Sequence, residues 1–226
     1  MRATSVSSPL LTKVRRRAAR MLDPSDADLP ERFILDLYPE GPALGVPMGE
    51  VHYNRSNLGP FEQYCTMMVA MAVGARRVFE IGTFDGATSL AVARACPEAE
   101  IWTLDLAAPS GPYDEENAHV SAGGVGSRFA GTNESARIHQ LFGDSTTFNF
   151  SEYRDMDLVI VDASHEYPNV VADSATAIRL VRPGGVVLWD DYLAGWPGVR
   201  QALNELAATG LDIIHVSSSA LAILRS

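Results

Sequence analysis

The sequence predicts an α/β fold in which helices cover both faces of a parallel sheet. From residue 60 onward, short apolar runs alternate with stretches of helical periodicity, as is typical of strand–helix–strand units. The chain has 226 residues, of which 46% are hydrophobic and 20% charged, which suits one sizeable domain. No run reaches the roughly 18 apolar residues of a membrane span, so we expect no contact with a membrane.

The expected elements follow one another in a regular order. Residues 22–59 are rich in proline and glycine, so we expect mostly loop there, with one short helix at 30–38. A helix should run from Pro60 to about Val73, because proline suits a first-turn position and apolar residues follow at helical spacing. Strands are expected at 77–81, 101–104, 138–142, 158–161, 185–189, 212–216 and 221–224, and further helices at 87–95, 168–181 and 197–208.

Two segments fall outside this alternation. Residues 107–136 contain five glycines and are too long for a simple connection, which indicates a lid-like insertion. We expect residues 1–59 to form an N-terminal helical and loop extension, either a lid or a dimer contact, and residues 60–226 to form the main domain. We expect a homodimer with the extension at or near the interface.

The charge of the chain is unevenly distributed. The first 20 residues carry six of the 18 basic side chains and no acidic one, whereas the remainder carries 12 basic and 28 acidic side chains. A body this negative repels phosphate backbones, so we expect no nucleic-acid partner. The basic head is either a targeting presequence or an amphipathic helix that docks on acidic surface.

The cysteines indicate the compartment. Cys65 and Cys96 form no CxxC or Cys/His cluster, which excludes a zinc module and a disulfide scaffold. We therefore expect a reducing cytoplasm.

A glycine-containing turn follows the first predicted strand of the main domain. It lacks the three glycines of a dinucleotide fingerprint, since Phe84 stands at the middle place and the turn contains no Lys or Arg. Glu80 ends the strand, where it could attract an ammonium group, and free N–H groups at the helix start could take a carboxylate. This pattern suits a ligand with a sulfonium and an amino-acid tail.

Two further turns complete this pattern at the ends of successive strands. Asp105 closes the second strand, where a carboxylate can accept both ribose hydroxyls. Gly143, Asp144 and Ser145 follow the third strand, where a small polar turn can bond an adenine edge. The alternative is that Glu80 and Asp105 only cap helices.

The run resembles class I S-adenosylmethionine-dependent methyltransferases, and more closely the small-molecule O-methyltransferases of methyltransferase family 24. The resemblance covers about residues 58–226 and rests on EIGTFDGATSLAVA, TLDL, LFGDS, VDASHEYPNVVADSATAIRLVRPGGVVLWDDY and ALAIL. It implies a Rossmann-like, doubly wound sheet of seven strands, the last antiparallel, with S-adenosylmethionine as cofactor. The cofactor-binding residues we predict are Glu80, Gly82, Thr83, Phe84, Thr88, Ser89, Asp105, Leu106, Gly143, Asp144, Ser145 and Asp162.

Acidic residues end the fourth and fifth predicted strands. Asp162 ends one, and Asp190 and Asp191 end the other, so neighbouring parallel strands should bring all three together. Carboxylates that converge in this way repel one another unless a cation lies between them, and Mg²⁺ is the usual hard divalent ion. We predict a metal site, for Mg²⁺ or another divalent cation, at Asp162, Asp190 and Asp191. Alternatively, these residues cap a loop or contact the cofactor without metal.

His165 follows Asp162 by three residues. Catechol-type O-methyltransferases have a lysine base at that position and Asp-Asn where this chain has Asp190-Asp191, so the chain is more similar to the macrolide-sugar enzymes. An imidazole is a good general base near neutral pH. We predict His165 as catalytic base with Asp162 beside it, the alternative being a histidine bonded to the backbone.

Three functions remain open at this point. The first is an O-methyltransferase, divalent-metal-assisted, that acts on a hydroxylated small molecule of the sugar or natural-product class, as in secondary metabolism. The second is a non-methylating enzyme on the same fold, such as a hydroxylase, cyclase or rearrangement catalyst. The third is a non-catalytic module that binds S-adenosylmethionine.

Overall fold

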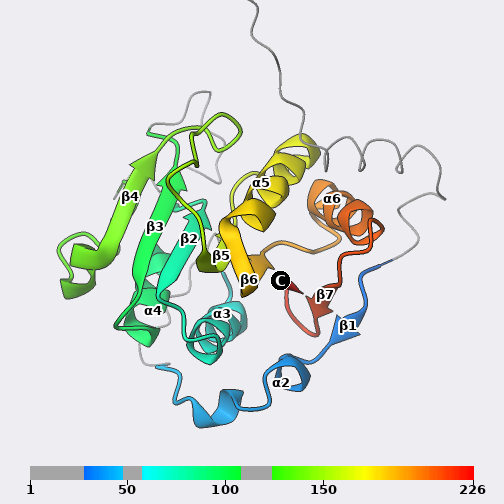
Figure 1. The fold of residues 1–226 in the computed structure, drawn as a ribbon, viewed down its shortest axis with the longest axis horizontal. Helices are drawn as coiled ribbons and strands as arrows, with labels where there is room; N and C mark the ends of the chain where they lie inside the picture. The colour runs from blue at the N-terminus through cyan, green and yellow to red at the C-terminus, as the bar shows by residue number, and fades with distance from the viewer. Residues whose placement is uncertain (1–27, 48–57, 108–123) are drawn as a thin grey trace, which may run out of the picture.

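The computed structural model describes residues 28–47, 58–107 and 124–226. Its strands form one eight-stranded sheet in the order β1-β7-β8-β6-β5-β2-β3-β4 (Figure 1). The strands are β1 (Glu31–Arg32), β2 (Arg77–Ile81), β3 (Glu100–Asp105), β4 (Ile138–Phe142), β5 (Met156–Val161), β6 (Val181–Trp189), β7 (Ile213–Val216) and β8 (Ala222–Arg225).

The topology confirms the predicted Rossmann-like sheet. All strand pairs are parallel except those of β8, which runs antiparallel to both β6 and β7. The predicted count of seven strands is one too low, because Glu31 and Arg32 pair with His215 and Val216 at the edge of the sheet. A two-residue strand has no periodicity that a sequence pattern could reveal.

The helices begin and end close to their predicted positions. Proline at the first turn begins α3, α5 and α6, since its missing N–H has no partner at a helix start anyway. The short helix expected at 30–38 is only one turn long, because β1 occupies the start of that range. The helices are α2 (Ile34–Leu37), α3 (Pro60–Ala72), α4 (Ala87–Ala95), α5 (Tyr167–Leu180) and α6 (Pro197–Ala207), with 3₁₀ turns η2 (Gly41–Ala43) and η5 (Asn133–Arg137).

Two hydrophobic cores lie on the two faces of the sheet. One contains Val78 and Leu158 with residues of α3 and α4, and the other contains Phe79 and Val159 with residues of α5 and α6. Successive residues of a strand point to opposite faces, so each central strand contributes to both cores. Helices therefore cover both faces, as predicted.

The described part of the N-terminal extension packs on the domain. The Leu29 amide donates a hydrogen bond to the Tyr192 hydroxyl, which in turn donates to Asn204. The basic head falls outside the described residues, as do residues 108–123 of the predicted insertion. Among the described helices, none is long and apolar enough to span a membrane.

Candidate functional site

The carboxyl ends of β2, β3, β5 and β6 meet at one edge of the sheet. Backbone hydrogen bonds continue past the strand ends, since the amide of Gly82 donates to Leu104, that of Asp162 to Ile81 and that of Asp190 to Val161. The residues that follow β2, β5 and β6 therefore begin at the same level along the edge of the sheet. This edge is where open α/β sheets bind their ligands.

The turn after β2 can only be built with glycine at its first position. Gly82 has a φ of +102°, and a Cβ there would lie 1.7 Å from the backbone oxygen of Asp162. Phe84 follows with a φ of +49°, a left-handed conformation that costs an L side chain roughly 1–2 kcal/mol. The turn is therefore strained and in direct backbone contact with the loop after β5.

Asp105 holds this turn from the side of β3. Its Oδ2 accepts hydrogen bonds from the amides of Thr83 (3.0 Å) and Phe84 (2.7 Å), and its Oδ1 accepts one from Leu106 (2.7 Å). The carboxylate thus orders the turn, and its remaining lone pairs are available to a ligand. The predicted contact with the ribose stays a prediction.

Glu80 lies beneath the turn with 1% of its surface exposed. Its Oε2 accepts hydrogen bonds from Ser89 (2.5 Å) and Thr103 (2.6 Å). Burial raises the pKa of this carboxyl to about 7, although the two hydroxyls partly offset the effect. Glu80 therefore ties α4 to β3, and its contact with a ligand stays a prediction.

The buried Glu80 makes stability depend on pH. Its folded pKa is raised above the ordinary value of 4.5, so the folded state binds the proton more tightly, and the unfolding free energy falls as pH rises from about 4.5 to about 7. In Glu80→Gln, we expect the fall in unfolding free energy over this pH range to be smaller by on the order of 3 kcal/mol, because glutamine does not titrate. Urea unfolding of both proteins at pH 5 and pH 7.5 checks this, and parallel pH profiles would contradict it.

The turn after β4 presents small polar groups. The Oδ1 of Asp144 accepts hydrogen bonds from the amide and hydroxyl of Thr146, which lower the pKa of Asp144. Asp173 of α5 is buried behind this turn, and burial raises its pKa to about 6, while the Ser145 hydroxyl lowers it. Gly143 lies against the ring of Phe148.

Two of the three predicted metal ligands, Asp162 after β5 and Asp191 after β6, lie close together, and His165 rather than Asp190 is the third member of the group. Ligand atoms of Asp162, His165 and Asp191 all lie within 4.8 Å of one another. Asp190 adjoins them, and its buried Oδ1 has no hydrogen-bond partner. Burial raises the pKa of Asp162 and Asp190 well above the usual range, and the neighbouring carboxylates raise both further.

His165 contacts Asp191 and Trp196. Its Nε2 lies 2.6 Å from the Oδ2 of Asp191, and its ring stacks on Trp196 with centroids 3.9 Å apart. Asp191 reaches this position with a left-handed φ of +62°. At the start of α6, a Cβ on Gly198 would lie 2.3 Å from the carbonyl oxygen of His165, so this glycine permits the close approach.

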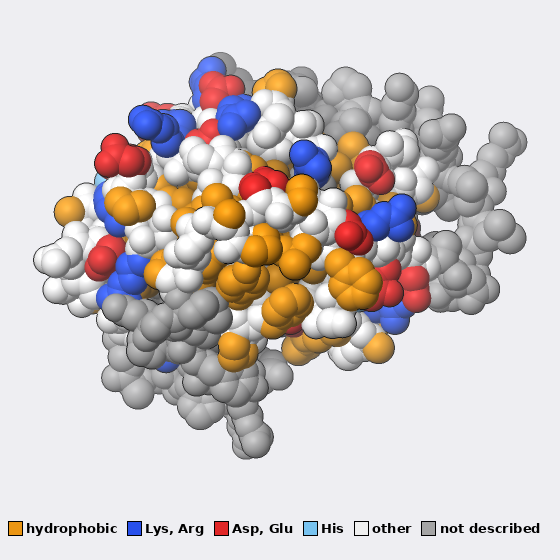
Figure 2. Space-filling model, turned by 90° about the horizontal axis from the view of Figure 1, so that it is seen from below, with side chains coloured by type: hydrophobic (Ala, Val, Ile, Leu, Met, Phe, Trp, Pro, Cys, Tyr) orange, Lys and Arg blue, Asp and Glu red, His pale blue; other side chains and the backbone are white. Residues whose placement is uncertain are grey.

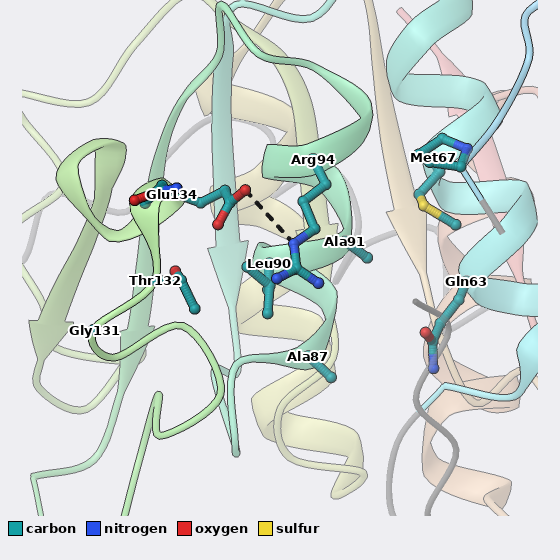
Figure 3. Close-up of a pocket in the computed structure, with 11 residues that line it drawn as sticks. Gln63, Met67, Ala87, Leu90, Ala91, Arg94, Gly131, Thr132 and Glu134 are labelled. Atoms are coloured by element: carbon teal, nitrogen blue, oxygen red, sulfur yellow. Dashed lines mark ion pairs between the residues drawn. The ribbon is translucent and has the colours of Figure 1, made fainter. Parts of the chain in front are cut away.

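A separate pocket of about 440 Å³ lies between α3, α4 and residues 131–134 (Figure 3). Gln63 and Met67 line one side, and an ion pair between Arg94 and Glu134 (3.6 Å) lies on the other. This pocket is not lined by Asp162, His165, Asp190 or Asp191, which we call the acidic cluster. We therefore assign the candidate chemistry to the acidic cluster and not to this pocket.

Three residues of the site were not predicted as site residues. Thr103 holds Glu80, Trp196 stacks on His165, and Arg128 pairs with Asp85 of the glycine turn at 2.5 Å. Thr103 is a polar residue in an apolar strand, which is a signal that the sequence offers. Arg128 lies 43 residues from its partner, and no local pattern marks it.

A family model described as a methyltransferase domain, Methyltransf_24, matches residues 79–192, half of the chain. The chain belongs to this family. The match spans the glycine turn, Asp105, the turn after β4 and the acidic cluster, and it confirms the resemblance inferred from the sequence.

Curated relatives agree with this membership. Catechol O-methyltransferase of Mycobacterium tuberculosis is 34% identical over 130 residues, which cover 57% of this chain and 53% of that protein. Caffeoyl-CoA O-methyltransferase 2 of Zea mays is 26% identical over 174 residues, which cover 74% of this chain and 62% of that protein. The chain thus matches less than two thirds of the length of either relative.

Solved structures share the fold. An O-methyltransferase from Bacillus cereus in complex with SAH superposes with a TM-score of 0.56 at 17% identity, covering 95% of this chain and 96% of that chain. The SAH-bound methyltransferase PaMTH1 of Podospora anserina gives a TM-score of 0.58 at 16% identity, covering 99% and 98%.

Proposed function

We propose that this chain is an S-adenosylmethionine-dependent O-methyltransferase, assisted by a divalent cation, that acts on a hydroxyl group of a small molecule. Membership of the methyltransferase family supports the activity, and the names of the two curated relatives support transfer to oxygen.

One observation carries the proposal. The Gly82 backbone touches the Asp162 carbonyl, so the turn expected to hold the methyl donor adjoins the cluster expected to hold the acceptor. A methyl donor and a group that activates a hydroxyl must lie side by side for direct transfer. A module that only binds the cofactor has no need for an imidazole paired with a carboxylate at this place.

The protein's own residues prepare the acceptor. If Nε2–H of His165 donates to Asp191, then Nδ1 is the ring nitrogen without a hydrogen and is the atom that would take the hydroxyl proton. Stacking on Trp196 restricts rotation of the ring. The hydroxyl oxygen that loses its proton becomes the nucleophile, and the bound cofactor supplies an electrophilic methyl group on its sulfonium.

The residues present fit a hard divalent cation. Asp190 offers a buried oxygen without a partner, and Asp162 and Asp191 offer carboxylates nearby. Burial first, and the neighbouring carboxylates after it, raise the pKa of Asp162 and Asp190, so a cation beside them would favour their charged forms. A cation such as Mg²⁺ would hold the acceptor oxygen and lower its pKa.

For the acceptor we favour a sugar or natural product. The support is His165, which stands where catechol-type enzymes have a lysine and is closer to the sugar-modifying branch. Incubation of the full chain with S-adenosylmethionine, Mg²⁺ and panels of sugars and polyphenols, read by mass spectrometry, tests this. Methylation of polyphenols alone would overturn a sugar as the acceptor, and a hydroxylated or cyclised product would overturn methyl transfer.

Methyl transfer should require the metal. We expect excess EDTA to abolish turnover and added Mg²⁺ to restore it, while S-adenosylmethionine binding measured by calorimetry stays close to its original value. Full activity in EDTA would remove the metal from the mechanism and leave Asp162, Asp190 and Asp191 as polar pocket residues.

A homodimer is also proposed, with part of residues 1–59 at the interface. Hydrophobic side chains gather in the middle of the surface seen from below in Figure 2, the side toward which α2 and α3 lie in Figure 1. Phe33 beside α2, Leu35 in α2 and Phe61 in α3 are exposed large hydrophobics. An interface would bury such residues, and a monomeric mass by light scattering would contradict it.

A further inference from the structure

A second segment, besides Asp105, holds the glycine turn. The Phe84 carbonyl accepts a hydrogen bond from Gly126 (2.9 Å), and the Asp85 carbonyl accepts one from Arg128 (2.9 Å). Residues 124–129 therefore lie along the outer edge of the turn. We call this segment the brace.

The brace also binds the turn through side chains. Nε of Arg128 lies 2.5 Å from Oδ2 of Asp85, while Oδ1 of Asp85 accepts the amide hydrogen of Ala87, the first residue of α4. One carboxylate thus connects the brace to the start of the helix. The side chains of Arg128 and Asp85 are only 29% and 13% exposed, so solvent screens this ion pair less than a surface pair.

Packing leaves the brace little freedom. Phe129 is 7% exposed, and its ring would lie 2.5 Å from a Cβ placed on Gly86 and 2.5 Å from one placed on Gly126. Both glycines have positive φ, so each permits a backbone path and a close approach that other residues would block. The ring is seated between the turn and the brace.

Charge gives the pairing a second consequence. Glu80, Asp85 and Asp105 lie near one another, and the charges of Asp85 and Asp105 raise the pKa of Glu80. The guanidinium of Arg128 offsets this repulsion at the position of Asp85. Without Arg128, the carboxylates of Glu80, Asp85 and Asp105 would repel one another more strongly. The brace that bonds to the carbonyl of the left-handed Phe84 would also be held less firmly.

We propose that Arg128 is a positioning residue for S-adenosylmethionine, which holds the cofactor turn in its binding conformation through Asp85 and the brace. This inference rests on the proposed function for the identity of the ligand. The geometry of the brace does not depend on that identity, so an experiment can contradict the role of Arg128 without contradicting the cofactor, and the reverse.

Full-length Arg128→Met and Arg128→Lys test this inference beside a matched control. Arg182→Met breaks an ion pair with Asp157, of 2.6 Å and similar exposure, that lies near the amino ends of β5 and β6. Calorimetry with S-adenosylhomocysteine measures binding, and hydrogen exchange of the 83–87 amides measures the conformation of the turn directly.

We expect Arg128→Met to weaken S-adenosylhomocysteine binding roughly 10-fold and to speed exchange of the turn amides by a similar factor. Arg128→Lys keeps the charge and should stay within about 3-fold of the wild type. Arg182→Met should leave both measurements unchanged.

Two results would overturn the inference: unchanged exchange in Arg128→Met, or an equal loss of affinity in Arg182→Met. Faster exchange in Arg128→Met without any binding of S-adenosylhomocysteine by the wild type would support the brace and overturn the proposed cofactor.

Discussion

Replacing Gly82 by valine should abolish binding of S-adenosylmethionine. The first carbon of the new side chain would lie 1.7 Å from the Asp162 oxygen, and that oxygen belongs to backbone held by the hydrogen bond from the Asp162 amide to Ile81. Relief of the clash must displace the turn from the strand end, so the cofactor loses its site. We expect a stability loss of roughly 3–5 kcal/mol from clash and strain together. Calorimetry and thermal unfolding measure the two effects.

Gly210 offers a control that separates clash from backbone strain. It has the same φ of +102°, but a Cβ placed on it would have no atom within 4 Å. Gly210→Val should therefore show the strain alone, with a smaller loss of stability and normal cofactor binding. Wild-type affinity in Gly82→Val would mean that the cofactor does not depend on this turn.

The elements that the sequence predicted well are those defined by local pattern. Arg77–Ile81 and Ile138–Phe142 match their predicted strands, because short apolar runs between polar turns identify buried strands. Ala87–Ala95 matches its predicted helix, because helical periodicity is also a local pattern. By contrast, β1 exists only because β7 lies beside it, and tertiary pairing of two residues leaves no local signal.

In the candidate site, too, some features follow from local pattern and strand order, and others do not. The approach of Asp162 to Asp191 follows from the order of parallel strands, which is a topological rule that a sequence can use. The contact of His165 with Trp196 depends on how the loop before α6 folds back, and the pairing of Asp85 with Arg128 depends on a segment 43 residues away. Side-chain contacts that cross such distances are set by packing and cannot be read from spacing.

Asp105 has a role in the structure that its sequence position did not predict. A carboxylate after β3 was predicted for the ribose, and the structure shows it bonded to three amides of its own chain. The alternative that it only caps a helix does not describe this geometry either, since the amides belong to the turn after β2 and to Leu106. If Asp105 also binds the ribose, as predicted, then ligand binding and formation of the turn would be coupled at this residue.

The second large effect is expected at His165. If its Nδ1 takes the acceptor proton, His165→Ala should lower the rate of methyl transfer about 10²–10⁴-fold, with little change in cofactor affinity. The wild-type rate should also fall on acidification, because a base works only when unprotonated. Steady-state rates across pH and calorimetry with S-adenosylmethionine measure both.

His139 is the matched control for this experiment, because its Nε2 also lies 2.6 Å from a carboxylate, that of Glu100, and its ring also stacks on a tryptophan, Trp102. That pair lies on β3 and β4, away from the acidic cluster, so His139→Ala should retain the wild-type rate.

A near-normal rate in His165→Ala at every pH would mean that the metal alone activates the hydroxyl and that His165 serves to hold Asp191. Loss of cofactor binding in His165→Ala would have a different cause: because Asp162 touches Gly82, a collapsed loop after β5 would displace the cofactor turn as well. The two outcomes differ in affinity, so the calorimetric measurement decides whether the imidazole acts on the proton or on the shape of the site.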